Sequence, residues 1–260
     1  MKISILTPSF NSGKYIDQSI MSVLDQDFTN IEHIISDNYS VDETHSILKK
    51  YKHLKVYIKK DEGQSDALNW MLKKSSGEII GWLNADDYYS PNIFKKIVKY
   101  FIDNPNVDAV YGNYNIVDDK NNYLRNVNVL RFISSFLPFI CFIPSTTFFF
   151  RSRIIKKNKI NLNIKYFYMM DKEFFCQITK KTKNIVKLDK VIASFRIHND
   201  AKTSFSLNRN SKKNFYFEGI DIINNYSLFK LRKDYSGILI YKFITFFFNI
   251  LSFFIKKLKL

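Results

Sequence analysis

The chain has 260 residues, of which 46% are hydrophobic, enough for one large α/β domain or for a domain with an appendage. The 7 glycines and 5 prolines exclude a linker-rich protein, and the 2 widely spaced cysteines exclude a disulfide framework or a Cys-x-x-Cys zinc site. The net charge of +16 indicates an anionic partner, such as a nucleotide, a nucleic acid or an acidic lipid, although an AT-rich genome would also enrich lysine.

The first hundred residues alternate between apolar runs and segments with helical spacing of apolar residues. We therefore expect four strands and four helices in alternation. The strands are predicted at 2–7, 31–36, 54–58 and 78–83, and the helices at 14–26, 42–51, 66–75 and 91–102. This alternation predicts a mostly parallel, Rossmann-like sheet with right-handed crossovers and helices on both faces.

The pattern loosens after residue 105, where short strands predict a mixed extension of the sheet. We expect strands at 109–111, 115–117, 123–127 and 191–197, and a helix at 171–180. Residues 132–143 are apolar but contain Pro138, which makes this segment too broken for a spanning helix.

Acidic side chains follow three of the predicted strands, at Asp37, at Asp61 and at the pair Asp86 and Asp87. Ligands of open α/β sheets bind at the carboxyl ends of strands. Two adjacent carboxylates at a buried strand tip are costly unless a cation is present, and Mg²⁺ prefers carboxylate and phosphate oxygens. The pair therefore predicts a metal–diphosphate site. The alternative is that one of these residues caps the helix that begins near Pro91.

Four segments of the N-terminal half carry the motifs of a known family. They are Thr7-Pro8-Ser9-Phe10-Asn11, SDNYSVDET at 36–44, DEGQSDALN at 61–69 and GEIIGWLNADD at 77–87. In this order they resemble glycosyltransferase family 2 over residues 2–100, with weaker similarity to about residue 205. The resemblance implies a GT-A fold, a nucleotide-sugar donor and inversion at the anomeric carbon.

The resemblance also implies which residues hold the donor. The first-strand loop and Asp37 hold the nucleoside, with Asp37 in contact with the base, and the Asp-x-Asp segment faces the ribose and the diphosphate. The implied donor residues are Thr7, Pro8, Ser9, Phe10, Asn11, Asp37, Asp66, Asn84, Ala85 and Asp86. The sequence departs from the family at Asn84, which replaces the first Asp of Asp-x-Asp. It departs again at Asn38 and Tyr39, which replace glycines.

The same resemblance implies a divalent cofactor, Mn²⁺ or Mg²⁺. The metal-facing role falls on Asp86, with Asp87 beside it. His198 ends a predicted strand at a place where related enzymes hold a histidine near the metal or diphosphate, and the alternative is a structural histidine. An ion bridging the two phosphates would stabilise the leaving group as charge develops.

Asp171 resembles the acidic residue that serves as the base of the family at the start of a helix. Apolar neighbours would raise its proton affinity, and the alternative is a carboxylate that caps the helix. Glu173 is the competing carboxylate on the same helix. Residues 144–151 resemble the segment of the family that lines the acceptor side, which implies an acceptor role for Ser145, Thr146 and Arg151. The alternative is a buried strand, and the two are compatible. Residues 200–206 are a candidate flap that excludes water from the donor.

Residues 237–255 are strongly apolar and are flanked by Lys230, Arg232 and Lys233 before and by Lys256, Lys257 and Lys259 after. We expect a helix that lies on an anionic membrane surface, and the alternatives are a single span or a helix packed on the domain. The expected organisation is a GT-A catalytic domain at 1–205 and a helical tail at 206–260. The domain divides into a nucleotide-binding half (1–105) and an acceptor-binding half (106–205).

These observations predict an inverting, metal-dependent glycosyltransferase of bacterial surface polysaccharide synthesis. Its donor would be a nucleotide sugar, with UDP favoured, and its acceptor a glycan or a polyprenyl-linked sugar. The expected location is cytoplasmic and peripheral, on the inner face of the cell membrane. One alternative is an inactive homologue that only binds nucleotide. The other is a basic nucleic-acid-binding protein, but no DNA or RNA motif is present, so no nucleic-acid partner is expected.

Overall fold

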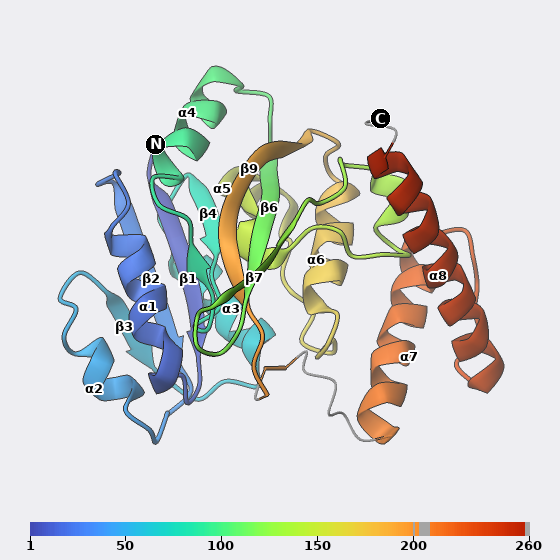
Figure 1. The fold of residues 1–260 in the computed structure, drawn as a ribbon, viewed down its shortest axis with the longest axis horizontal. Helices are drawn as coiled ribbons and strands as arrows, with labels where there is room; N and C mark the ends of the chain where they lie inside the picture. Colours follow the sequence, from blue (N-terminus) through green and yellow to red (C-terminus); the bar gives the residue numbers. More distant parts are fainter. Residues whose placement is uncertain (200, 203–208, 258–260) are drawn as a thin grey trace.

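The computed structural model describes residues 1–199, 201–202 and 209–257. Within them, a nine-stranded mixed sheet forms the centre of the molecule, and helices cover both of its faces (Figure 1). The strand order is β3-β2-β1-β4-β8-β6-β9-β5, and β7 pairs with β6 off this path. The predicted α/β class is confirmed.

The N-terminal half is a parallel α/β unit. Its elements are β1 (Ile3–Ser9), α1 (Gly13–Leu24), β2 (Ile31–Asp37), α2 (Thr44–Leu48), β3 (Lys55–Ile58), α3 (Gln64–Lys74) and β4 (Ile79–Trp82). β1 pairs in parallel with both β2 and β4, and β2 pairs in parallel with β3. All four predicted strands are present. β1, β2 and β4 carry the apolar run of a buried parallel strand, whereas β3 is a partly exposed strand at the edge of the sheet.

The C-terminal half extends the sheet with mixed pairing. Its elements are β5 (Tyr88–Tyr89), α4 (Phe94–Asp103), β6 (Ala109–Val117), β7 (Tyr123–Val127), β8 (Phe149–Arg151), α5 (Ser152–Asn158), α6 (Met170–Thr179) and β9 (Ile185–Arg196). β8 is antiparallel to β4 and β6, whereas β6 and β9 are parallel. The two short strands predicted at 109–117 are one strand, and the strand predicted at 191–197 begins at Ile185.

The carboxyl ends of β1, β2 and β4 lie at one edge of the sheet. The register pairs Ser9 with Asp37 at the last position of β1 and β2. Next to β1, β4 requires glycine at position 81, because a Cβ there would lie 2.6 Å from Cε1 of Phe149 and 2.9 Å from Cδ1 of Ile5. Close packing in the middle of β4 thus brings the segment after Trp82 to the same edge as the loops after β1 and β2.

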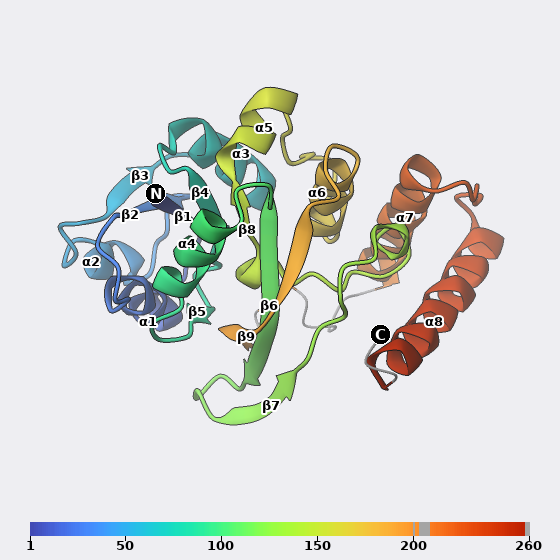
Figure 2. The ribbon, with the colours of Figure 1, turned by 90° about the horizontal axis from the view of Figure 1, so that it is seen from above.

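Two helices, α7 (Arg209–Tyr226) and α8 (Tyr235–Lys257), pack side by side beyond α6 (Figure 2). A Cβ on Gly219 of α7 would lie 2.4 Å from Cζ of Tyr241, so this glycine lets the two helices approach. The ring of Phe248 stacks on Phe139 of the catalytic unit, with centroids 4.3 Å apart and an interplanar angle of 7°. One side of α8 therefore packs on the rest of the protein. This agrees with one of the alternatives predicted for the tail, a helix packed on the domain.

The opposite side of α8 is apolar and exposed. Its exposed residues are Tyr235, Leu239, Ile240, Phe243, Phe246, Phe247, Ile250, Phe253 and Phe254. By length and composition, α8 could also cross a membrane. Lys259 and the expected boundary between 205 and 206 lie outside the described residues, and so does most of the flap expected at 200–206.

Candidate active site

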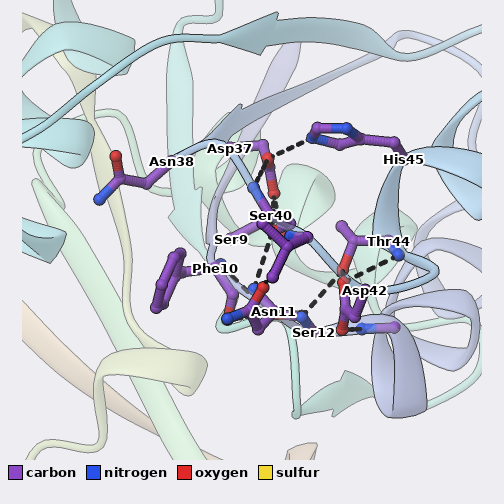
Figure 3. Close-up of polar contacts among 12 residues, drawn as sticks. Ser9, Phe10, Asn11, Ser12, Asp37, Asn38, Ser40, Asp42, Thr44 and His45 are labelled. Carbon is purple, nitrogen blue, oxygen red and sulfur yellow. Dashed lines mark hydrogen bonds and ion pairs between the residues drawn. The ribbon is translucent and has the colours of Figure 1, made fainter.

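Asp37 organises the loops that follow β1 and β2 (Figure 3). Its carboxylate accepts hydrogen bonds from Ser9 Oγ at 2.9 Å, from Ser40 N at 2.9 Å and from Ser40 Oγ at 2.6 Å. The Nε2 atom of His45 lies 2.6 Å from its Oδ1 atom, and Asp37 is 0% exposed. The expected direct contact with a nucleoside base stays a prediction, and it would add to the protein contacts that the carboxylate already makes. Through these contacts Asp37 positions the loops.

Two residues of these loops have left-handed backbone conformations. Asn11 has a φ of 48° and Tyr39 a φ of 54°, so Tyr39 rather than Asn38 takes the conformation that the family gives to glycine. Asn11 Oδ1 accepts a hydrogen bond from Val41 N at 2.9 Å and joins the two loops. Phe10 and Tyr39, 61% and 58% exposed, therefore present aromatic rings to solvent beside a fixed backbone.

Thr7 lies below this surface and Pro8 is partly buried. The Thr7 hydroxyl is buried and lies 3.0 Å from Nε2 of His33, so its side chain does not reach the loops. Asp66, in the first turn of α3, accepts a hydrogen bond from Glu62 N at 3.3 Å. Among the residues predicted to bind the donor, Thr7 therefore has a side chain that packs inside the protein.

Asp86 and His198 meet at the same edge of the sheet from segments 112 residues apart. Nε2 of His198 lies 3.0 Å from Oδ2 of Asp86. The His198 side chain is 9% exposed and that of Asp86 is 30% exposed. Within the described residues, Nδ1 of His198 is buried and has no hydrogen-bond partner. The structure therefore brings together two of the three residues predicted to face a metal.

Asp87, the third, faces the protein interior. Its Oδ2 accepts hydrogen bonds from Thr146 Oγ1 at 2.7 Å and Asn84 Nδ2 at 3.0 Å, and its Oδ1 accepts one from Arg196 N at 3.0 Å. Burial, together with the nearby charge of Asp86, raises its pKa to about 7. The prediction of Asp87 as a metal ligand is revised: it holds the Asp86 loop in place. Neither carboxylate caps α4, whose N-cap is Ile93.

Asn84 explains why the family's first aspartate is absent here. Its Nδ2 donates to Asp87, and its Oδ1 accepts hydrogen bonds at 2.9 Å from Gln64 Nε2 and at 2.9 Å from Trp82 Nε1. A carboxylate at position 84 would place a second negative charge against Asp87. The amide therefore suits this position, and the next residue, Ala85, is buried.

Gln64 and Lys202 join the donor edge to α6, a link that we did not predict. Oε1 of Gln64 lies 3.4 Å from Nζ of Lys202, and Nζ also lies 3.8 Å from Sδ of Met170 at the start of α6. The Ser65 hydroxyl contacts the same sulfur at 3.1 Å. The first turns of α3 and α6 thus flank one region. In the sequence, the motif at 61–69 contains Gln64 and the candidate flap at 200–206 contains Lys202, but nothing predicted that the two meet.

Asp171 lies in the first turn of α6 and lines a pocket of about 330 Å³. Its Oδ1 accepts a hydrogen bond from Lys172 N at 2.7 Å. Burial raises its pKa above the ordinary aspartate value. The competing Glu173 is buried elsewhere, where it accepts hydrogen bonds from Tyr226 OH at 2.5 Å and Gln177 Nε2 at 2.8 Å. Asp171 is therefore the carboxylate of α6 that faces a pocket.

The expected acceptor-side residues separate in the structure. Thr146 contacts Asp87 and Ser145 precedes it in a short 3₁₀ turn (Ser145–Thr147), so both lie near the Asp86 loop. Arg151, however, pairs with Ile79 at the opposite end of β4. Its guanidinium donates to Val107 O at 2.8 Å and to Phe101 O at 2.6 Å. The prediction of Arg151 as an acceptor residue is wrong, because its charge serves buried carbonyls far from the site.

We predict that Arg151→Met lowers the free energy of unfolding by about 2–4 kcal/mol, because two buried carbonyls lose their donors. Denaturant unfolding would measure this loss. The folded fraction should keep the acceptor KM of the wild type, and an increased acceptor KM without loss of stability would contradict this assignment.

The described residues contain no cluster of three or more His, Cys, Asp or Glu side chains that could bind a metal.

The profile of "Glycosyl transferase family 2" matches residues 4–179. The chain belongs to glycosyltransferase family 2. This confirms the resemblance found in the sequence.

Solved structures of other glycosyltransferases have the same GT-A fold as this chain. The S. aureus TarS structure, in complex with UDP-GlcNAc, superposes with a TM-score of 0.68 at 21% identity and covers 88% of this chain and 68% of its own. The mannosyltransferase PcManGT from Pyrobaculum calidifontis, in complex with GDP-Man and Mn²⁺, gives a TM-score of 0.62 at 16% identity, with coverage of 86% and 63%.

Among sequence relatives, the putative teichuronic acid biosynthesis glycosyltransferase TuaG of Bacillus subtilis is 31% identical over 106 residues, which are 39% of this chain and 42% of TuaG. The chain spans about a fifth to a third of the length of the first curated relatives that it matches, at 21%, 32% and 21%. Family membership thus rests on the profile match to residues 4–179.

Proposed function

We propose that this family 2 protein transfers a sugar, with inversion, from a nucleotide-sugar donor to a hydroxyl of a glycan or polyprenyl-linked acceptor. A UDP-sugar is the favoured donor, and TarS was solved with UDP-GlcNAc. Bacterial surface polysaccharide synthesis is the favoured setting, in keeping with the name of TuaG. The observation that carries the proposal is the distance of 3.0 Å between Asp86 Oδ2 and His198 Nε2 at the strand tips. Gln64 contacts both Asn84, next to this pair, and Lys202, near the start of α6.

The Asp86–His198 pair fits a divalent ion such as Mn²⁺ or Mg²⁺. Asp86 Oδ2 and His198 Nε2 lie 3.0 Å apart in hydrogen-bond contact, and the carboxylate oxygen and the deprotonated imidazole nitrogen would hold the ion. Two protein ligands are few, but Mg²⁺ is usually held by one or two carboxylates together with water and substrate phosphates. When bound, the ion would stabilise the charge that develops on the departing diphosphate.

The protein's own groups supply the remaining steps. Asp171 accepts the proton of the acceptor hydroxyl, whose oxygen attacks the anomeric carbon from the face opposite the diphosphate. Lys202, whose pKa burial lowers, offers an ammonium between the donor edge and Asp171. The Arg196 guanidinium donates to Asp86 O, Asp118 O and Gln18 Oε1, so it helps to hold the Asp86 loop in place.

A screen of nucleotide-sugar hydrolysis tests this function. Purified protein would be incubated with Mn²⁺ or Mg²⁺ and a panel of UDP-, GDP- and TDP-sugars. Release of nucleotide diphosphate from one donor supports an active transferase. Tight nucleotide binding without turnover of any donor, with or without acceptor lipid, would favour the inactive homologue that Asn84 and Tyr39 suggest.

We propose that the exposed apolar face of α8 binds an anionic membrane surface, on the cytoplasmic side of the cell membrane. Lys256 and Lys257 follow the apolar residues in the last turn of α8. Aromatic residues beside lysines favour an interfacial position on acidic lipid, while the inner side of α8 stays packed on the domain.

We expect the double variant Phe243→Ser/Phe247→Ser to bind phosphatidylglycerol vesicles at least 10-fold more weakly, because two exposed rings no longer enter the lipid. Vesicle co-sedimentation would measure this. The matched control is Tyr123→Ser/Leu124→Ser, which removes two exposed apolar side chains from β7. Equal vesicle binding by both double variants would contradict the role of α8.

A further inference from the structure

The pocket beside Asp171 has walls from four separate parts of the chain. Phe139 to Cys141 form one wall, α6 provides Asp171 and Lys172, and α7 and α8 contribute Phe215 and Tyr241. Its volume of about 330 Å³ lies at the lower end of small-molecule sites. This is room for one sugar ring and a neighbouring group, and not for a long glycan.

Lys172 is a buried cation at the wall of this pocket. It is 3% exposed, and its Nζ donates one long hydrogen bond, at 3.4 Å, to Phe139 O. Nζ also lies 5.8 Å from the centroid of the Tyr241 ring. In the part of the chain that the structure describes, no carboxylate lies within 4.0 Å of Nζ.

An ammonium in such a position is unfavourable unless an anion joins it. Burial lowers the pKa of Lys172, and the nearby charge of Asp171 offsets this only in part. A lysine at this position, in place of a methionine or leucine, is favourable if a bound ligand supplies a negative charge that pairs with its ammonium group.

The remaining walls indicate that the anion belongs to an amphiphile. Phe139, Phe215 and Tyr241 give the pocket aromatic sides. Tyr241 and Asn249 reach the pocket from α8, the helix whose opposite face carries the exposed phenylalanines. An apolar chain leaving the pocket would therefore lie beside α8, whose opposite face we propose to bind the membrane.

We propose that this pocket binds the phosphate-proximal end of a lipid-phosphate-linked acceptor, with Lys172 Nζ on the phosphate and the hydroxyl of the first sugar at Asp171. This inference rests on the proposed transferase function and deepens it by choosing the lipid-linked acceptor over the free glycan and by naming the residue that binds its phosphate. Lys172 is a binding residue that helps to orient the acceptor.

Calorimetric titration with geranyl phosphate, geraniol and inorganic phosphate tests the proposal. We expect the wild type to bind geranyl phosphate at least 10-fold more tightly than either fragment, and Lys172→Met to weaken that binding at least 10-fold. Lys165→Met, which removes an exposed lysine just before α6, should bind like the wild type. Lys172→Met should melt no lower than the wild type, because it removes an unpaired buried charge; Lys172→Gln repeats the test with a polar side chain.

Three results would overturn the proposal: no binding of geranyl phosphate by the wild type, equal binding by Lys172→Met, or binding of geraniol or free phosphate as tight as that of geranyl phosphate. The last would assign the site to a lipid chain alone or to free phosphate. Failure of the wild type to hydrolyse any nucleotide sugar is a separate result, which concerns the proposed function and not this pocket.

Discussion

Replacing Asp86 with alanine is expected to lower the rate of sugar transfer by about 10³-fold or more. Asp86 is the carboxylate at the strand tips that is partly exposed and contacts His198. Its neighbour Asp87 is buried in hydrogen bonds and cannot take over without breaking them. Steady-state transfer measured at saturating Mn²⁺ would give the size of the loss.

The matched control is Asp103→Ala, which removes an exposed carboxylate on α4 that pairs with Lys99. It should leave transfer unchanged, since a surface ion pair contributes about 0–1 kcal/mol to stability. Transfer by Asp86→Ala within a few-fold of the wild-type rate would show that the leaving group is stabilised elsewhere.

Asp171→Asn is expected to lower kcat by about 10²–10⁴-fold, the range of a lost general base, while the nucleotide affinity stays the same. Asparagine keeps the shape of the side chain but cannot accept the hydroxyl proton. Single-turnover transfer and nucleotide titration would separate the two effects.

The pH profile supplies a second check on Asp171. The base acts when deprotonated, and burial raises its pKa above the ordinary value of 3.8. Wild-type kcat/KM should therefore fall as the pH drops through this raised pKa, and Asp171→Asn should lack that limb. Glu173→Gln, on the same helix but turned toward Tyr226, should retain both kcat and the limb. Equal kcat for Asp171→Asn and the wild type would show that another group is the base.

The parallel half of the fold could be predicted because its strands are short apolar runs and each is followed by a helix. The second half was harder, since the first part of β9 contains Lys187, Asp189 and Lys190 among its apolar residues and so lacks an apolar run there. β8 has only three residues, and its position between β4 and β6 depends on contacts distant in sequence.

The sequence predicted which segments form the site, but it did not predict which of their side chains face the ligand. The strand tips identified Asp86, but sequence does not show that Asp37 and Asp87 already accept three or more hydrogen bonds from the protein. Arg151 follows an apparent acceptor motif, yet the antiparallel register of β8 carries it to the other end of the sheet. Charge and spacing identify candidates, and register decides which of them face the ligand.

The affinity for UDP with and without Mn²⁺, measured by calorimetry on the wild type, Asp86→Ala and His198→Ala, tests most directly whether the strand tips hold a metal-bound diphosphate. We predict that Mn²⁺ tightens UDP binding at least 10-fold in the wild type and that each substitution removes most of this gain. UDP binding that is independent of Mn²⁺, or equally Mn²⁺-dependent in all three proteins, would contradict the assignment of Asp86 and His198.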